Sequence, residues 1–316
     1  MKKLVMSRHN LALGMALVLL LVALFKPAIP MKREVRSYLF VVDVTQSMNT
    51  VDMALDGKRV SRIAFARALL GKTLSEIPCG TMISLGVFSA ESVALLFTPI
   101  EVCANYAVVQ DSIANLEWRM AWRGNSRLRF GLPSAAALVS LYQTPARVIF
   151  MTDGDEAPKL NAVNKTDLSG WQGGRGWLLV GIGGDEPSPI PKFDSDDKIL
   201  GYWAYSNSIL APSQVQSEES VGTRDSTIAS DVYDRYLSQL DETYLRELAE
   251  EIGAKYLRGH DPEGLGDAMQ DMEPAGELEA EARLDGWLII AAMLLLLSSY
   301  ARSFGDKLQG WRRKLA

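Results

Sequence analysis

The sequence predicts an α/β domain with a mostly parallel sheet, helices on both faces and one antiparallel hairpin at an edge. Two short apolar runs, Tyr38–Val42 and Val148–Met151, have the length and β-rich composition of strands buried between two layers. Val60–Ile77 has the spacing of an amphipathic helix. Met82–Phe88 and Val93–Phe97 are separated by four small or polar residues, which is typical of a hairpin.

The remaining elements follow the same alternation along the chain. We expect a loop over 49–59, because this stretch is polar, and a long insertion over 183–237, which is rich in Pro, Ser and Asp. The other predicted elements are helices over 106–116, 130–142 and 241–252 and strands over 147–153, 177–182 and 254–257. Together these elements describe a doubly wound sheet with an elaboration inserted late in the chain.

Both ends of the chain contain an apolar stretch without charged residues. Leu11–Phe25 and Gly286–Ala301 are each somewhat shorter than the roughly 20 residues that a membrane helix needs, and Ala28–Pro30 extends the first. We expect two membrane helices; the alternatives are a cleaved signal peptide for the first and a buried core helix for the second. The predicted segments are 1–35 (tail and anchor), 36–260 (domain), 261–285 (acidic linker), 286–301 (membrane helix) and 302–316 (basic tail).

The charges suggest an orientation for these segments. Residues 1–25 contain three basic residues and no acid, and residues 302–316 contain five basic residues and one acid. Residues 26–301 therefore carry 25 basic and 37 acidic side chains. Basic flanks face the cytoplasm, so the domain between them is predicted to lie outside it. Its acidity argues against nucleic acid as a partner.

The two cysteines flank the predicted hairpin at its open end. Cys79 and Cys103 lie at nearly equal distances in sequence from the turn near Ala90 and Glu91. Paired strands would bring the two residues together, and an oxidising compartment permits a bond between them. A disulfide is therefore predicted; the alternative is two unpaired buried cysteines.

Three oxygen-bearing side chains follow the first predicted strand. Asp43, Thr45 and Ser47 stand at alternate positions just past its carboxyl end, where open α/β sheets bind ligands. One carboxylate and two hydroxyls are hard ligands that suit Mg²⁺ better than zinc or copper. The plainer interpretation is that these residues cap a helix.

Asp43-Val44-Thr45-Gln46-Ser47 resembles the D-x-[ST]-x-S signature of von Willebrand factor A (VWA) domains, whose metal-ion-dependent adhesion site binds a divalent cation. Thr152-Asp153-Gly154 matches the family's later strand-end Asp, and Gly124-Asn125-Ser126 stands where the family has a Gly-Thr turn, with Ser in place of Thr. The resemblance implies that Ser126 and Asp153 join the first three residues around Mg²⁺. It also implies that an Asp or Glu of a partner protein completes the cation's coordination.

Further segments narrow the resemblance to bacterial membrane-anchored VWA proteins, both the aerotolerance type and the type associated with methanol dehydrogenase. They are Pro78-Cys79-Gly80, Trp118–Trp122, Pro189-Ile190-Pro191, Gly201-Tyr202-Trp203 and Leu240–Ala249. The resemblance implies a periplasmic domain on the bacterial inner membrane that serves assembly or maturation of a periplasmic metalloenzyme. Other VWA proteins and a MoxR-type AAA ATPase are the implied partners.

The sequence contains few of the residues and motifs that catalysis requires. His9 and His260 are the only histidines, and there is no phosphate-binding G-x-x-x-x-G-K-[ST] loop. A phosphatase like the haloacid dehalogenase superfamily needs a second Asp two positions after Asp43, where this chain has Thr45. We therefore expect a non-catalytic binding protein. A VWA scaffold that binds no metal and packs constitutively in a membrane complex is the alternative.

Overall fold

The computed structural model describes residues 8–205, 227–260, 262–298 and 300. The chain forms two compact units. One comprises residues 34–276, and the other combines the two chain ends, 1–33 and 277–316.

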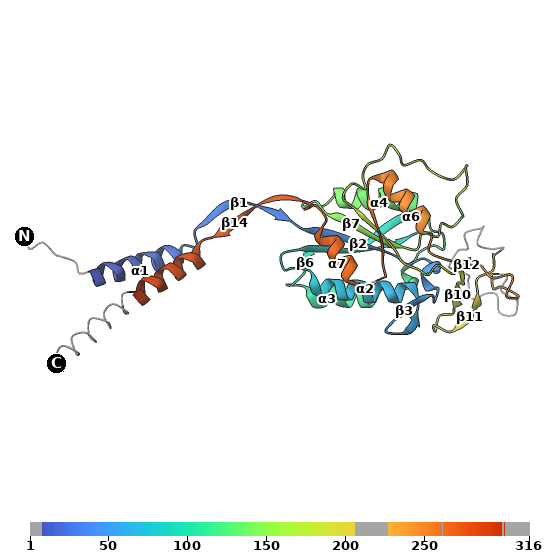
Figure 1. Ribbon diagram of the computed structural model, residues 1–316, viewed down its shortest axis with the longest axis horizontal. Coiled ribbons are helices and arrows are strands. Elements are labelled where there is room, and N and C mark those ends of the chain that lie inside the picture. The colour runs from blue at the N-terminus through green and yellow to red at the C-terminus, as the bar shows by residue number, and fades with distance from the viewer. Residues whose placement is uncertain (1–7, 206–226, 261, 299, 301–316) are drawn as a thin grey trace, which may run out of the picture. The chain divides into compact units, whose positions relative to one another are not determined.

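A six-stranded sheet is the centre of the 34–276 unit (Figure 1). Its strands, in spatial order, are β13 (Lys255–Arg258), β8 (Leu178–Gly181), β7 (Arg147–Thr152), β2 (Ser37–Asp43), β5 (Met82–Ser89) and β6 (Ser92–Glu101). The first five run parallel, and β6 pairs antiparallel with β5 at one edge. The predicted sheet, with one antiparallel hairpin at its edge, is thus confirmed.

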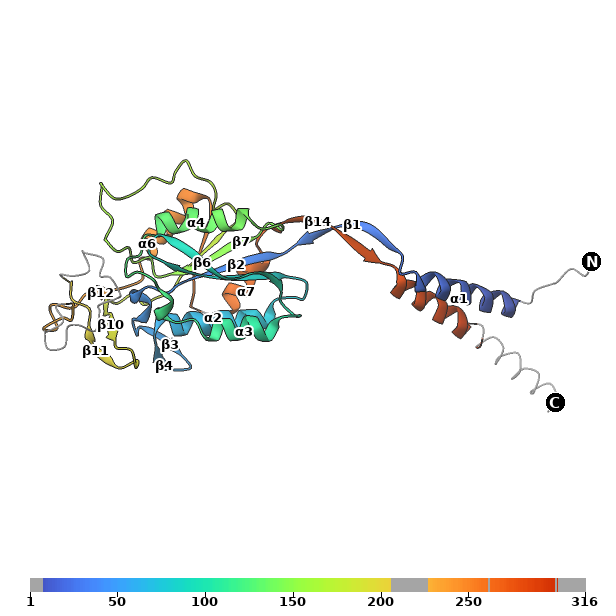
Figure 2. The same ribbon diagram turned by 180° about the vertical axis from the view of Figure 1, so that it is seen from behind.

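Helices cover both faces of this sheet, as Figures 1 and 2 show from opposite sides. One face carries α2 (Arg62–Glu76), α3 (Tyr106–Ala114) and α7 (Pro262–Gln270); the other carries α4 (Leu128–Ser140) and α6 (Glu242–Ile252). Alternate residues of β2 point to opposite faces, so Phe40 joins the first core and Leu39 joins the second. Burial on both faces explains why this strand is apolar at every position.

The helix ends follow local capping rules. The Ser61 hydroxyl accepts a hydrogen bond from the Ala64 amide at the start of α2. Asp241 caps α6 in the same way, and Gly253 ends that helix with a φ of 75°, a conformation that glycine adopts without strain. Two short 3₁₀ turns, η1 (Gln46–Asn49) and η2 (Trp118–Met120), lie in the loops that follow β2 and α3.

The prediction of a loop over 49–59 is wrong. This stretch contains a small hairpin of β3 (Met53–Leu55) and β4 (Lys58–Val60). Asp56 and Gly57 form its two-residue turn, both with positive φ. Asp-Gly is a strong hairpin signal, so the sequence did carry the information, although the flanking residues are too polar to look like strands.

The predicted insertion contains short strands in its described parts. They are β9 (Ser188–Pro189), β10 (Pro191–Phe193), β11 (Ile199–Tyr202) and β12 (Leu237–Ser238), while residues 206–226 lie outside the described residues. Phe193 stacks on Trp118 of η2, with ring centroids 6.2 Å apart, and Arg119 forms an ion pair with Asp197. The insertion therefore packs against the loops at the carboxyl edge of the sheet.

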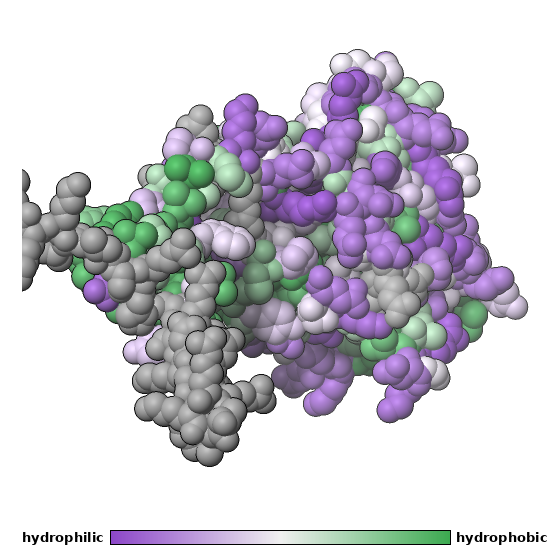
Figure 3. Space-filling view, turned by 60° about the vertical axis from the view of Figure 1, so that its left-hand side comes forward, coloured by the Kyte–Doolittle hydropathy of each residue, from purple (hydrophilic) through white to green (hydrophobic). Residues whose placement is uncertain are grey.

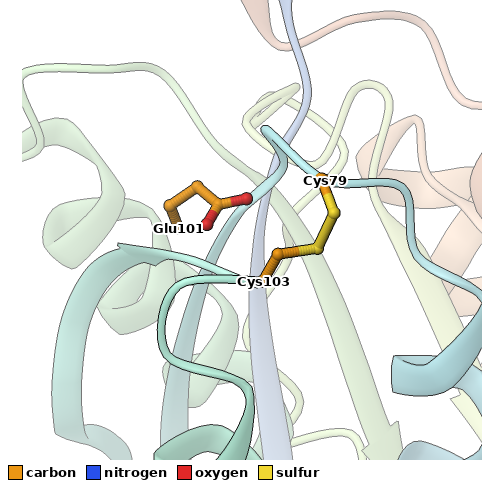
Figure 4. Close-up of side chains that lie close together, drawn as sticks. All are labelled: Cys79, Glu101 and Cys103. Carbon is orange, nitrogen blue, oxygen red and sulfur yellow. A yellow bond between two sulfur atoms is a disulfide. The ribbon is translucent and has the colours of Figure 1, made fainter.

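Cys79 and Cys103 form a disulfide, as predicted, with their Cα atoms 5.3 Å apart (Figure 4). Glu101 lies beside the sulfur atoms, and its carboxylate accepts hydrogen bonds from the amides of Gly80 and Ala104, both at 2.6 Å. The covalent bond and the carboxylate thus fasten both chain segments at the open end of the β5–β6 hairpin.

Most of the surface on the face in Figure 3 is hydrophilic.

The flanking segments pair with each other. β1 (Ala28–Val35) and β14 (Gly276–Arg283) form a two-stranded sheet, next to α1 (Arg8–Leu24) and a helix over 285–298. The Leu284 amide donates to the Pro27 carbonyl, and the Ala275 amide donates to the Val35 carbonyl, so the strands run in opposite directions. The expectation that Ala28–Pro30 extends the first apolar helix is therefore wrong.

Two further expectations concern the ends. The segment predicted as an acidic linker, 261–285, instead contains α7 and β14. Within the described parts of the chain, no helix combines the length and apolarity needed to cross a membrane. Residues 299 and 301–316, which include the end of the second predicted span and the basic tail, lie outside the described residues.

Candidate functional site

The two predicted carboxylates lie at neighbouring strand ends. β2 ends at Asp43, and Asp153 directly follows β7, which pairs parallel with β2. Both residues are fully buried. The hydroxyl of Thr152 donates to Asp43 Oδ2 at 2.7 Å. Parallel pairing therefore brings residues 110 positions apart in sequence to one edge of the sheet.

The loop after β2 folds back onto Asp43. Asp43 Oδ1 accepts hydrogen bonds from the Thr45 amide at 2.9 Å and from the Thr45 hydroxyl at 2.6 Å. The Ser47 hydroxyl, in the 3₁₀ turn η1, lies 3.4 Å from Thr45 Oγ1. The D-x-T-x-S spacing thus gathers three oxygen-bearing side chains within hydrogen-bonding reach of one another.

Ser126 comes to the same place by backbone pairing. Its amide and carbonyl both bond to Ala157, and the amide of the next residue, Arg127, bonds to the carbonyl of Ala90 at the end of β5. The Ser126 hydroxyl is buried and has no hydrogen-bond partner among the described residues. Such an orphaned oxygen is unfavourable unless something else binds it.

The hydroxyl-bearing side chains of the site line one small pocket. Its cavity measures about 50 Å³ and is lined on the domain side by Thr45, Ser47, Ser126 and Asp155. Asp43 and Asp153 do not line it, but each bonds to a residue that does: Asp43 to Thr45, and Asp153 Oδ1 to the Asp155 amide. The structure therefore gathers all five predicted residues at one site, with the two carboxylates behind the hydroxyls.

The electrostatics of the site call for positive charge. Burial raises the pKa of Asp43 to about 7, and the nearby charge of Asp153 adds to this against the hydrogen bonds from Thr45 and Thr152. Burial also raises the pKa of Asp153, although the Arg62 guanidinium opposes the shift. Two buried carboxylates beside three hydroxyls form the hard-oxygen environment that Mg²⁺ binds. The residues thus fit the cation that the sequence predicts.

Sequence reasoning missed Arg62, the first residue of α2. Its guanidinium is fully buried and donates to Asp153 Oδ2 at 2.6 Å and to both carboxylate oxygens of Asp52. It also bonds to the hydroxyl and carbonyl of Ser238 at 2.8 and 3.1 Å. A basic residue in a first helical turn gives no sequence signal of burial, so nothing in the pattern could have identified this role.

Sequence reasoning also missed the outer wall of the pocket. Three residues of the insertion line the same pocket as the hydroxyls: Ile190, Trp203 and Tyr236. The Tyr236 hydroxyl donates to Asp155 Oδ1 at 3.0 Å. Asp155 stands two residues after Asp153. An acid this close to a strand-end Asp is a sequence feature that could have identified Asp155 as part of the site.

Comparisons with known proteins agree with the fold. Residues 38–156 match the model of a family described as the von Willebrand factor type A domain. The fold is similar to that of an aerotolerance-related membrane protein from Bacteroides fragilis, with 15% identity and a TM-score of 0.50 over 75% of this chain and 98% of that chain. BatB, a conserved hypothetical protein from Bacteroides thetaiotaomicron, is similar over the same shares of the two chains, with 14% identity and a TM-score of 0.53. No curated protein matches the chain.

Proposed function

We propose, on the premise that residues 38–156 are a von Willebrand factor type A domain, that the protein binds other proteins through a divalent cation. Asp43, Thr45, Ser47, Ser126 and Asp153 would hold that cation, with Mg²⁺ the first candidate. The observation that carries the proposal is the buried Ser126 hydroxyl, which lacks a partner and lines a pocket with Thr45 and Ser47. When bound, the cation would supply positive charge that an Asp or Glu of a partner can bind.

The proposed role is binding rather than catalysis. Thr45 stands two residues after Asp43, where a phosphatase of the haloacid dehalogenase type requires an acid. Its hydroxyl donates to Asp43 and is therefore committed to holding that carboxylate in place. Asp43 and Asp153 would contribute charge and position, and the hydroxyls would contribute neutral oxygens.

The proposed location is the bacterial inner membrane, with the VWA domain in the periplasm. Basic residues at both chain ends support this orientation, and a disulfide suits an oxidising compartment. The similar protein from Bacteroides fragilis is itself described as a membrane protein. Partners in such a setting would be other VWA proteins, a MoxR-type AAA ATPase system, or a periplasmic metalloenzyme during its maturation.

One observation favours a second candidate, a scaffold that needs no metal. The Arg62 guanidinium already places a cation 2.6 Å from Asp153 Oδ2 and neutralises part of the buried negative charge. In that case the domain would pack in a membrane complex through its surface alone. The two candidates differ in whether partner binding depends on a divalent ion.

A crosslinked pull-down from membranes separates them. Wild-type protein, with and without EDTA, is compared with Asp43→Ala and Ser126→Ala. Ser126→Ala removes a hydroxyl that has no partner, so it should leave the fold intact while weakening the cation's shell. Asp111→Ala, an exposed change in α3, is the matched control.

The proposal expects that EDTA and both site variants lose the same partners, whereas Asp111→Ala retains them. Recovery of identical partners under all conditions would reject the metal-dependent function and favour the scaffold. Circular dichroism of each variant checks that the fold is unchanged.

A further inference from the structure

Asp155 contributes a second unpaired oxygen to the pocket. Its Oδ1 accepts hydrogen bonds from the Tyr236 hydroxyl at 3.0 Å and from Lys159 Nζ at 2.6 Å. Its Oδ2 is buried and, among the described residues, has no partner. The side chain is 3% exposed, although the Lys159 side chain that pairs with it is 64% exposed.

This arrangement is more than an ion pair. When both oxygens of a carboxylate face water, an ion pair with an exposed lysine adds little to the stability of the fold. Here Asp155 lines a pocket together with Thr45, Ser47 and Ser126, and its buried Oδ2 has no hydrogen-bond partner among the described residues. A buried carboxylate oxygen without a donor is unfavourable unless a cation or a water molecule binds it.

The backbone holds Asp155 in this orientation. Gly154, with a φ of 77°, turns the chain after Asp153, and the Asp155 amide donates to Asp153 Oδ1 at 2.9 Å. A Cβ at position 154 would lie 3.0 Å from Leu245 Cγ of α6, which is a tight contact and adds to the preference for glycine that the positive φ sets. Asp155 is therefore fixed to the predicted metal-binding residues on one side and to Tyr236 on the other.

We propose that Asp155 is an internal ligand of the cation and fills the position that a partner's carboxylate would take. This inference rests on the proposed metal-dependent function and adds its regulation. Asp155 Oδ2 completes the oxygen set from within the chain, and Ile190, Trp203 and Tyr236 line the same pocket. A partner carboxylate then binds the cation only by displacing Asp155, and with it the hydrogen bond to Tyr236.

The size of the pocket supports an internal ligand. Its cavity of about 50 Å³ has room for an ion and for few further atoms. Ile190, Trp203 and Tyr236 form part of its lining, so a partner carboxylate that reaches the cation would compete with Asp155 for this small space. Displacing Asp155 would also break its hydrogen bond to the Tyr236 hydroxyl.

Metal binding to the full-length protein in detergent tests the proposal. Mn²⁺ serves as the probe, because free Mn²⁺ is measured directly by electron paramagnetic resonance, and Mg²⁺ is then titrated as a competitor. We expect one site in the wild type and at least tenfold weaker binding in Asp155→Asn. Lys159→Met removes the ion pair to Oδ1 and leaves Oδ2 in place, so its affinity should stay within threefold of the wild type.

Two controls separate the possible failures. Asp43→Ala tests the proposed function itself: if neither the wild type nor this variant binds Mn²⁺, that function fails. If the wild type binds and Asp43→Ala does not, but Asp155→Asn binds as tightly as the wild type, only the present inference fails. Equal losses in Asp155→Asn and Lys159→Met would show that Asp155 acts through its ion pair, which also overturns the inference.

Acetate, compared with chloride at equal ionic strength, tests the exchange of carboxylates. It should restore Mn²⁺ affinity in Asp155→Ala and leave the wild type unchanged. Failure to restore any affinity would overturn the claim that an external carboxylate can take this position.

Discussion

Glu156, a buried acid next to Asp155, allows a quantitative test of how an ionised carboxylate affects the stability of this region. Its side chain is buried, and Oε1 accepts a hydrogen bond from the Tyr244 hydroxyl at 2.7 Å. Burial raises its pKa from 4.5 to about 7, against the opposing hydrogen bonds from Tyr244 and from the amides at the start of α4. Below about pH 7 the folded protein therefore favours the neutral acid.

Glu156→Gln replaces this group with a neutral one of the same shape. Each pH unit between the two pKa values corresponds to about 1.4 kcal/mol, so ionised Glu156 destabilises the fold by roughly 3 kcal/mol. Below pH 4.5 the acid is neutral in both the folded and unfolded states, so the penalty is absent. It grows as the pH rises and is complete above about pH 7.

Urea unfolding of both proteins with EDTA present, at pH 4 and pH 8, measures the difference. We expect equal free energies of unfolding at pH 4 and a variant that is more stable by up to about 3 kcal/mol at pH 8. Glu247→Gln, an exposed change in α6, should show no such dependence. The reasoning is refuted if Glu156→Gln is less stable than the wild type at pH 8, or if its effect is the same at both pH values.

Two other changes test the buried ion cluster and the disulfide. Arg62→Met should lower the free energy of unfolding by about 3–5 kcal/mol, because it leaves two buried carboxylates without their cation, whereas exposed Arg59→Met should have little effect; equal losses in both variants would contradict this assignment. Replacing Cys79 and Cys103 with Ser, which opens a link between residues 24 apart, should cost about 2–4 kcal/mol in urea unfolding. Reduction of the wild type should produce the same loss, and unchanged unfolding after reduction would show that the bond contributes nothing.

Local sequence patterns were sufficient to predict the sheet and the carboxylate of Asp43, whereas Asp153 was assigned to the site by the resemblance to VWA domains. The runs before Asp43 and Asp153 are apolar at every position because both faces of the sheet are covered. Strands that are buried on both faces and joined by helices usually pair in parallel, so their carboxyl ends meet at one edge. The disulfide followed from the same logic, since a hairpin brings its flanks together.

The rest of the site depends on contacts that no local pattern encodes. Arg62 is buried only because Asp52, Asp153 and Ser238 surround it, and these residues come from three separate segments. Tyr236 reaches Asp155 across 81 positions of sequence. The insertion was predicted from its composition, but composition does not indicate where such a segment packs.

The hydrogen bond between the Ala275 amide and the Val35 carbonyl has a topological consequence. The two ends of the 34–276 unit therefore lie beside each other. Joining Val35 to Ala275 through a short glycine bridge would close the domain into a ring. New ends could then be opened at the Asp56–Gly57 turn, and the order of elements along the gene would change while every strand of the six-stranded sheet kept its neighbours.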